Sequence, residues 1–194
     1  MPKTRVAVLI SGHGSNLQAL IDASGAPDYP AEIALVISNK PDAFGLTRAT
    51  QAGIATRVLA HTDFPSREAF DAALHEALVE AKIEFVCLAG FMRVLSAGFV
   101  AQWAGRMINI HPSLLPKYKG LHTHQRALDA GEKTHGCTVH WVSAGVDEGA
   151  LIGQASLEIL STDTAETLSA RVHALEHPLY VRCLKEVLLK ARRA

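Results

Sequence analysis

The segment from residue 6 to residue 21 is Val6-Ala7-Val8-Leu9-Ile10-Ser11-Gly12-His13-Gly14-Ser15-Asn16-Leu17-Gln18-Ala19-Leu20-Ile21. Its first five residues form a short apolar run, which predicts a strand. Leu17, Leu20 and Ile21 recur at the i, i+3, i+4 spacing of one helix face. The glycines between these two parts predict a tight turn. The segment is therefore typical of a strand–turn–helix unit.

The same alternation of apolar runs and helix-period segments continues along the chain, as in βαβ units. We expect further parallel strands at residues 33–37, 56–59, 85–88 and 107–110. The runs 137–142 and 151–160 also predict strands, which can pair antiparallel at one edge of the sheet. The predicted fold class is α/β, an open, mostly parallel twisted sheet with helices on both faces. Residues 1–194 are expected to form a single domain.

Several residues predict where the helices begin and end. Asp42 and Ser66 are suited to cap two helices, because their side-chain oxygens can accept free backbone N–H groups. Gly53 is placed to end the first of these helices. A last helix is expected over residues 165–190, with Pro178 as a boundary or kink.

Charge and hydropathy exclude several kinds of partner. The formal net charge is zero, so no broad basic surface for nucleic acid or an anionic membrane is expected. No apolar run approaches the roughly 18 residues of a membrane-spanning helix. Cys87, Cys137 and Cys183 are far apart and odd in number, which indicates buried thiols in a reducing compartment. No signal peptide precedes Val6, so we expect a cytoplasmic protein. We also expect its substrates to be small molecules.

The glycine turn is a candidate anion site, because it presents backbone N–H groups at the start of a helix. Leu17 stands where a dinucleotide fingerprint has its third glycine, and the lysine of a nucleoside-triphosphate loop is absent. A single phosphate group fits better, with Ser15 and Asn16 as side-chain donors. A tight turn that merely needs glycine has about equal weight on these residues alone.

A second candidate site is the segment Asn109-Ile110-His111-Pro112-Ser113-Leu114-Leu115-Pro116. Residues two apart in a strand share a face, so Asn109 and His111 project together. Pro112 ends the strand. Open α/β sheets bind ligands at such carboxyl ends. An amide and an imidazole there suit a reaction in which charge develops on a carbonyl oxygen.

The turn over residues 143–149 holds two adjacent acids, Asp147 and Glu148. If this turn reaches the end of the strand at residues 107–110, the Asp147 carboxylate can contact His111. A carboxylate at that distance favours the imidazolium form and would tune His111 for proton transfer. Taken alone, a charged turn is more often a solvated surface loop.

Other chemistries have weaker support. His122 and His124 could suggest a metal, but no cysteine or carboxylate spacing completes a metal site, so no metal is expected. His140 falls within a strand, and no Gly-x-Ser-x-Gly nucleophile turn occurs. Asn109 and His111 are therefore expected to assist a reaction between two bound substrates.

The chain resembles the phosphoribosylglycinamide formyltransferase family over nearly its whole length. Matching segments are residues 9–19, 89–96, 109–118 and 120–124. The 109–116 block marks the wider group that transfers or releases formyl from 10-formyltetrahydrofolate. The glycine turn with Ser15 and Asn16 narrows the resemblance to the glycinamide type. The resemblance implies a Rossmann-like formyltransferase fold and formyl transfer to glycinamide ribonucleotide in purine biosynthesis.

The resemblance also implies roles for particular residues. Asn109 and His111 would stabilise a tetrahedral intermediate, with Asp147 holding His111 charged. The ribonucleotide-binding residues would be Gly14, Ser15, Asn16, His173, Ala174, Leu175 and Glu176. The folate-binding residues would be Arg67, Met92, Arg93, Val94, Leu95, Asn109, Ser143, Ala144, Gly145, Val146 and Asp147. 10-Formyltetrahydrofolate would be the co-substrate, and the protein would be a monomer or weak homodimer.

The chain departs from the family pattern at three positions. His13 stands where many relatives have asparagine, and Lys119 and Ala150 stand where proline is usual. His13 is expected to alter phosphate affinity, Lys119 to loosen the loop before His122, and Ala150 to make the Asp147 loop more flexible.

Three rival functions remain open on the residues. A formyltetrahydrofolate hydrolase would place water where the amine binds. A transferase acting on initiator tRNA would need an RNA-binding domain and a basic surface. A non-enzymatic nucleotide-binding module would explain the glycine turn but not the pair Asn109 and His111.

Overall fold

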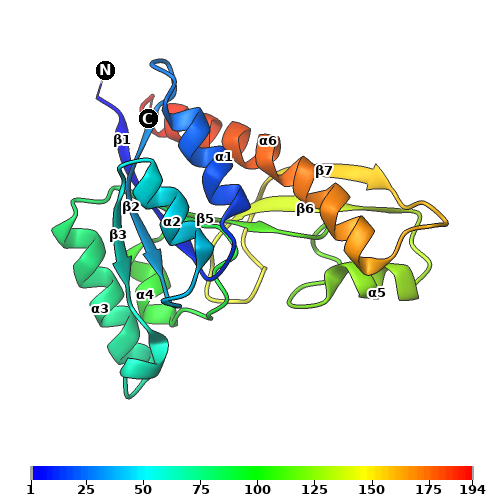
Figure 1. The fold of residues 1–194 in the computed structure, drawn as a ribbon, viewed down its shortest axis with the longest axis horizontal. Coiled ribbons are helices and arrows are strands. Elements are labelled where there is room, and N and C mark those ends of the chain that lie inside the picture. Colours follow the sequence, from blue (N-terminus) through cyan, green and yellow to red (C-terminus); the bar gives the residue numbers. More distant parts are fainter. Residues whose placement is uncertain (1, 194) are drawn as a thin grey trace.

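The computed structural model describes residues 2–193 and contains one seven-stranded sheet flanked by helices (Figure 1). The strands are β1 (Thr4–Ile10), β2 (Ala31–Ser38), β3 (Ala55–Val58), β4 (Phe85–Leu88), β5 (Met107–His111), β6 (Thr134–Trp141) and β7 (Leu151–Glu158). The helices are α1 (Ser15–Ser24), α2 (Phe44–Gln51), the short 3-10 helix η1 (His61–Asp63), α3 (Arg67–Glu80), α4 (Ala97–Gln102), α5 (Thr123–Asp129) and α6 (Ala165–Ala191).

The strand order is β3-β2-β1-β4-β5-β6-β7, with β1 to β5 parallel and β6 and β7 antiparallel at one edge. The predicted fold class and the antiparallel edge are confirmed. The chain runs outward from β1 to β3 and then returns to β4, so the direction of the strand order reverses between β1 and β4. Ligands of open α/β sheets bind at the carboxyl ends of the strands at such a point.

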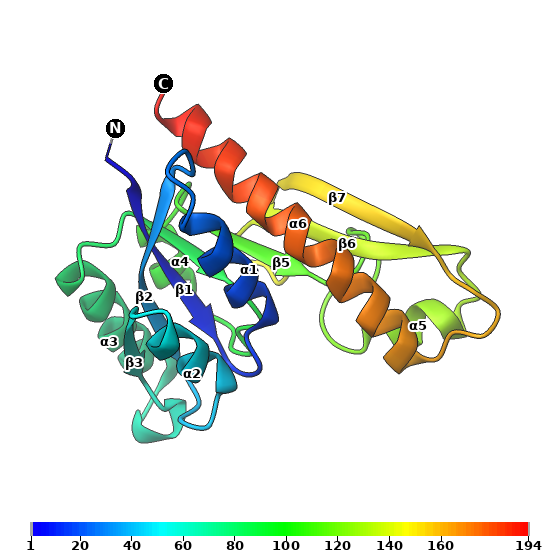
Figure 2. The ribbon, with the colours of Figure 1, turned by 45° about the horizontal axis from the view of Figure 1, so that its top comes forward.

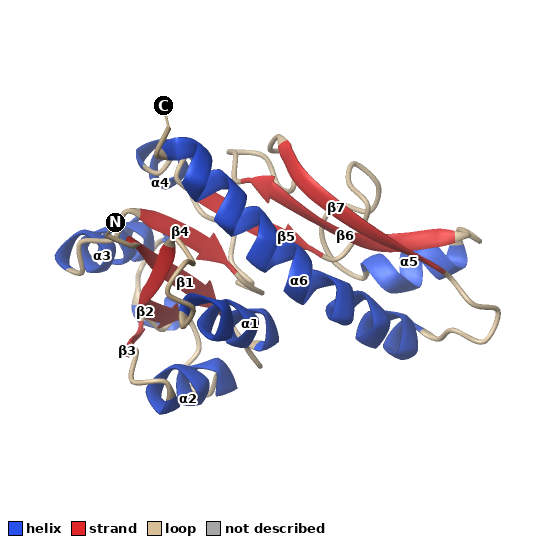
Figure 3. Ribbon diagram, turned by 90° about the horizontal axis from the view of Figure 1, so that it is seen from above, coloured by secondary structure: helices blue, strands red, loops and turns tan. Residues whose placement is uncertain are grey.

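Both faces of the sheet are covered, because side chains alternate along each strand. Val6 and Val8 pack into one core with residues of α1, α2 and α6, whereas Ala7 and Leu9 pack into a second core with α3 and α4. Figures 2 and 3 show α6 running along one face, with α3 and α4 on the other side of the sheet. No helix among residues 2–193 is long and apolar enough to cross a membrane.

Ser66 caps α3 as predicted, since its hydroxyl accepts the Ala69 N–H, and Gly53 follows the end of α2 with a positive φ of 71°. The prediction that Asp42 caps α2 was wrong. The N-cap is Ala43, which has no side-chain hydrogen bond. The N–H of Gly45, in the first turn, donates instead to the carbonyl of Gly12 at 3.0 Å. A tertiary contact has replaced the side-chain cap.

Pro178 is not a helix boundary, because it lies inside α6, which continues to Ala191. Proline lacks the N–H that would bond the carbonyl four residues earlier. That carbonyl belongs to Ala174. Both Ala174 and Pro178 are exposed, so water can reach the carbonyl oxygen.

Tyr180 ties α6 to two central strands, at the carboxyl end of β4 and near the start of β5. Its side chain is fully buried, and its hydroxyl lies 2.9 Å from the carbonyl oxygen of Leu88 and 3.2 Å from that of Ile108. Residues i and i+4 share a helix face, so Glu176 is directed to the same edge of the sheet one turn earlier. The final helix is thereby held against β4 and β5.

We expect Tyr180→Phe to lower the free energy of unfolding by about 1–2 kcal/mol, because buried carbonyls lose their hydroxyl donor. Chemical denaturation of the purified protein measures this loss. Tyr118→Phe is the matched control, since its hydroxyl bonds Glu132 near the surface. Equal losses in the two variants would contradict the role given to Tyr180.

Candidate active site

The candidate site is built at the carboxyl end of β5. Asn109 and His111 lie two residues apart in this strand, and His111 is only 6% exposed. In the antiparallel pair with β6, Asn109 faces His140 and His111 faces Thr138. Pro112 follows at once and ends the strand, as the sequence predicted.

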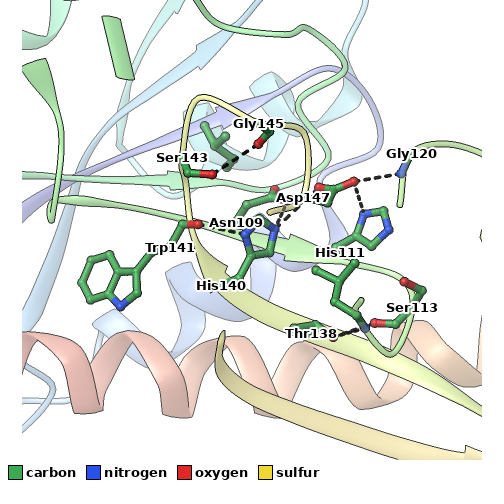
Figure 4. Close-up of polar contacts among 12 residues, drawn as sticks. Asn109, His111, Ser113, Gly120, Thr138, His140, Trp141, Ser143, Gly145 and Asp147 are labelled. Atoms are coloured by element: carbon green, nitrogen blue, oxygen red, sulfur yellow. Dashed lines mark hydrogen bonds and ion pairs between the residues drawn. The ribbon is translucent and has the colours of Figure 1, made fainter. Parts of the chain in front are cut away.

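The loop between β6 and β7 reaches this strand end. The Asp147 Oδ2 atom lies 3.3 Å from His111 Nδ1, and the same oxygen accepts the Gly120 N–H at 2.9 Å (Figure 4). Asp147 adopts a positive φ of 52°, which is uncommon for a residue with a Cβ. Three separate segments therefore meet at one carboxylate.

His140 is a member of this cluster that the sequence analysis did not select. Its Nδ1 lies 2.9 Å from the Trp141 carbonyl oxygen, so Nδ1 carries a proton and donates it. Its Nε2 lies 3.1 Å from Asn109 Nδ2 and 3.6 Å from Asp147 Oδ1. With the proton on Nδ1, His140 Nε2 accepts one N–H of the Asn109 amide and orients it. Strand register placed His140 here, and periodicity alone does not give register.

The pKa of Asp147 is lowered from its usual value of 3.8. Burial of the carboxyl raises the pKa, but the contact with His140, the hydrogen bond from the Gly120 N–H and the charge of His111 together outweigh it. Asp147 is therefore a carboxylate at neutral pH. Its negative charge stabilises positive charge on the adjacent His111 imidazole.

The second ring nitrogen of His111 also faces an acceptor. His111 Nε2 lies 2.9 Å from the carbonyl oxygen of Tyr118, a residue with a positive φ of 57°. Only a protonated imidazole has two N–H groups, so the imidazolium satisfies both acceptors. To give a proton to a substrate, His111 must first break its hydrogen bond to the Asp147 carboxylate or to the Tyr118 carbonyl oxygen.

The glycine turn follows β1 and opens α1. Gly14 is the N-cap of α1 with a φ of 76°, and a Cβ there would lie 2.7 Å from the Cα of Gly45. A larger residue would push the turn off α2, so glycine is required by space as well as by conformation. Ser15 is the first helical residue, and its hydroxyl has no hydrogen-bond partner within residues 2–193.

Asn16 and Glu176 meet across the molecule beside this turn. Asn16 Nδ2 donates to Glu176 Oε2 at 2.7 Å, and Glu176 is only 2% exposed. Asn16 Oδ1 is buried and has no partner within the described residues. His173 Nε2 lies 3.9 Å from the same Glu176 oxygen. Ala174 is exposed and Leu175 is half-buried, on other faces of α6.

The residues implied for folate binding lie mainly in the segment after β4. Met92 is 65% exposed and Val94 49%, whereas Leu95 is buried. The Arg93 guanidinium lies over the Phe70 ring at 4.6 Å. Arg67 is exposed at the start of α3, and Ser143, Ala144, Gly145 and Val146 lead to Asp147 in the β6–β7 loop.

The three departures from the family pattern have defined surroundings. The His13 ring stacks on Phe44, and Arg48 donates to the His13 carbonyl oxygen at 2.9 Å. Lys119 Nζ lies 2.9 Å from Glu148 Oε1, so the loop before His122 is joined to the Asp147 loop by an ion pair. This pair is exposed and contributes little to stability. The Ala150 carbonyl accepts the Trp141 N–H.

Within residues 2–193, no group of three or more histidine, cysteine, aspartate or glutamate side chains is arranged to hold a metal ion.

Comparison with known proteins places the chain in a family. Residues 4–184 match the family model described as "Formyl transferase". The chain is 50% identical over 175 residues to the "Phosphoribosylglycinamide formyltransferase" of Escherichia coli strain K12, covering 90% of this chain and 82% of that protein.

Larger proteins also contain a similar region. The chain is 58% identical over 184 residues to the "Trifunctional purine biosynthetic protein adenosine-3" of Drosophila melanogaster. That match covers 94% of this chain but only 14% of the trifunctional protein.

A solved structure of the phosphoribosylglycinamide formyltransferase from Brucella melitensis has the same fold. It is 53% identical in sequence and superposes with a TM-score of 0.92, covering 96% of each chain. The fold, the family model and the sequence identity agree, and the chain belongs to the phosphoribosylglycinamide formyltransferase family.

Proposed function

We propose that this protein transfers the formyl group of 10-formyltetrahydrofolate to the amine of N1-(5-phospho-D-ribosyl)glycinamide, a step of de novo purine (IMP) biosynthesis. The observation that carries the proposal is the meeting of Asn109, His111 and Asp147 at the end of β5. The strand pairing supports the proposal. The glycine turn follows β1, Leu9 pairs with Leu88, and Leu88 pairs with Asn109, so the turn and Asn109 lie at the same end of neighbouring strands.

The proposed reaction is direct amine attack through a tetrahedral intermediate. The amine nitrogen attacks the formyl carbon and releases one proton to solvent water, and negative charge develops on the formyl oxygen until the carbonyl reforms. One Asn109 N–H is held by His140, which leaves the second free to donate to this oxygen. His111 donates a proton as the bond to N10 of the folate breaks, and Asp147 keeps the imidazolium charged.

The ribonucleotide is proposed to bind between the glycine turn and α6. The backbone N–H groups at Gly14, Ser15 and Asn16 start a helix that has no acidic residue in its first turn, so a phosphate dianion is favoured there. The Glu176 carboxylate and the unpaired Asn16 Oδ1 can accept ribose hydroxyl groups. His173, Ala174 and Leu175 complete the proposed site.

The folate is proposed to bind against the segment Met92–Leu95 and the loop Ser143–Asp147. The exposed apolar side chains of Met92 and Val94 suit the flat ring system of a folate. Arg93 Nε is buried and has no hydrogen-bond partner within residues 2–193. Arg67 is the other arginine that the family resemblance assigns to the folate site. Their positive charges complement the carboxylates of the folate glutamate tail.

We further propose one formyltransferase domain over residues 1–194, cytoplasmic, in a monomer or weak homodimer, without nucleic-acid partners. The rival hydrolase would release formate from 10-formyltetrahydrofolate without the ribonucleotide. The decisive assay mixes both substrates and follows tetrahydrofolate release. Release that does not depend on the ribonucleotide would overturn the proposed function.

In that assay, we expect Asn109→Ala to lower kcat by about two to three orders of magnitude, as for the loss of an oxyanion donor. The exposed amide variant Gln125→Ala is the control and should keep the native rate. A kcat for Asn109→Ala within a few-fold of native would remove Asn109 from the reaction.

We expect Asp147→Asn to lower kcat by about 10²–10⁴. Because the pKa of Asp147 is lowered, its charge is lost only as pH falls below the ordinary carboxyl range, so the defect should persist from about pH 5 to pH 9. Glu148→Gln is the adjacent control, and a kcat for Asp147→Asn within a few-fold of native would remove Asp147 from the reaction.

We expect Ser15→Ala to raise the KM for the ribonucleotide by about 3- to 20-fold and the KM for the folate less, because one hydroxyl donor to the phosphate is lost. Ser24→Ala, at the other end of α1, is the matched control. A larger effect on the folate KM would show that the glycine turn serves another ligand.

A further inference from the structure

The segment Met92–Leu95, called the folate segment below, has an irregular backbone. It follows β4 and lies between that strand and α4, and no helix or strand includes it. Leu88 pairs with Asn109, so the chain leaves the sheet directly beside the candidate catalytic amide. An irregular segment has no hydrogen-bond ladder of its own, so other groups must fix its position.

A single side chain supplies the hydrogen bond at its start. The Met92 N–H donates to the Ser11 hydroxyl at 2.7 Å. Within residues 2–193, no other backbone N–H from residue 90 to residue 95 has a hydrogen-bond partner. Ser11 is only 6% exposed, so this bond is protected from exchange with water.

The Ser11 hydroxyl is itself oriented by Asn39. It donates its one proton to Asn39 Oδ1 at 2.5 Å, which leaves its lone pairs for the Met92 N–H. Asn39 is 2% exposed at the end of β2, and its Nδ2 lies 3.4 Å from His61 Nδ1. The chain Asn39–Ser11–Met92 is thus a partly buried polar network in which the Met92 N–H donates to Ser11 and the Ser11 hydroxyl donates to Asn39.

The far end of the folate segment is held in a similar way. The Ser96 N–H donates to Asp71 Oδ2 at 2.7 Å, and Asp71 is 4% exposed on α3. Between these two ends the segment presents Met92 and Val94 outward. Asp71 anchors the segment to α3, whereas Ser11 anchors it to the glycine turn, because Ser11 directly precedes Gly12.

We propose that Ser11 is a positioning residue for folate binding: its hydroxyl, oriented by Asn39, fixes the folate segment relative to the glycine turn. The proposal rests on the function proposed above. Ser11 need not touch either substrate. It sets the distance between the apolar wall for the folate and the turn for the ribonucleotide phosphate, and so aligns the formyl carbon with the amine.

The test compares Ser11→Ala with the native protein by three measurements: the KM of each substrate, the Kd of tetrahydrofolate alone, and hydrogen exchange of the Met92 amide. We expect the folate KM and the tetrahydrofolate Kd to rise by about 5- to 100-fold, because buried hydrogen-bonding groups lose their partner. The ribonucleotide KM should change by less than about threefold, and the Met92 amide should exchange faster.

Ser38→Ala is the matched control, because it removes two hydrogen bonds to Lys40 from a fully buried serine without touching the folate segment. In the native background, Asn39→Ala should raise the folate KM. In the Ser11→Ala background, the same substitution should raise the folate KM by less than about a further twofold. Additive effects would mean that Asn39 does not act through Ser11. Ser11→Thr, which keeps the hydroxyl, should restore most of the folate affinity.

Equal changes in both substrate constants, or an unchanged tetrahydrofolate Kd in Ser11→Ala, would overturn the proposal. If Ser11→Ala does not fold, hydrogen exchange of the Met92 amide is compared between the native protein and Asn39→Ala. Fast exchange of this amide in the native protein would contradict the hydrogen bond from Met92 to Ser11 on which the proposal rests. The two proposals can fail separately. If Ser11→Ala weakens tetrahydrofolate binding but the native protein transfers no formyl group, the proposed function is refuted and the positioning role stands.

Discussion

The site depends on a single half-buried carboxylate, that of Asp147, which is shared by three partners. His111 and the Gly120 N–H contact one oxygen, and His140 faces the other. A buried carboxylate without such partners would become neutral, because burial opposes its charge. The partners keep the charge, and the charge in turn favours the protonated form of the adjacent imidazole. The position of His111, the orientation of Asn109 through His140 and the approach of two loops all follow from this arrangement.

Bringing these loops together costs backbone strain. Asp147, Tyr118 and His122 all have positive φ values between 52° and 57°. Residues with a Cβ hold such a conformation only when the surrounding contacts impose it, and such strain gathers at functional sites. Here the contacts are the Tyr118 carbonyl on His111 and the Gly120 N–H on Asp147. The exposed ion pair between Lys119 and Glu148 lies next to them but cannot supply the same stabilisation.

Much of this fold could be predicted from sequence, because periodicity and helix caps are local signals. The apolar run at Val6–Ile10, the glycine turn and the Ser66 cap needed no knowledge of distant residues. Asp42 does not cap α2, because the Gly12 carbonyl in the glycine turn accepts the Gly45 N–H at the start of that helix. Pro178 does not end α6, because the Ala174 carbonyl that it leaves without a donor can bond water. No role could be assigned to His140 or Ser11 from sequence, for the same kind of reason. Their partners come from strand register and from loops that are far away in the sequence.

Titration of the Asp147 carboxyl carbon by NMR, from neutral pH into the acid range, tests directly whether this carboxylate keeps its charge. The shared carboxylate predicts a resonance that stays in its ionised position until the pH falls below the ordinary value of 3.8. A midpoint at or above that value would show that burial prevails over the three partners. The charge on which the account of His111 and Asn109 depends would then be absent.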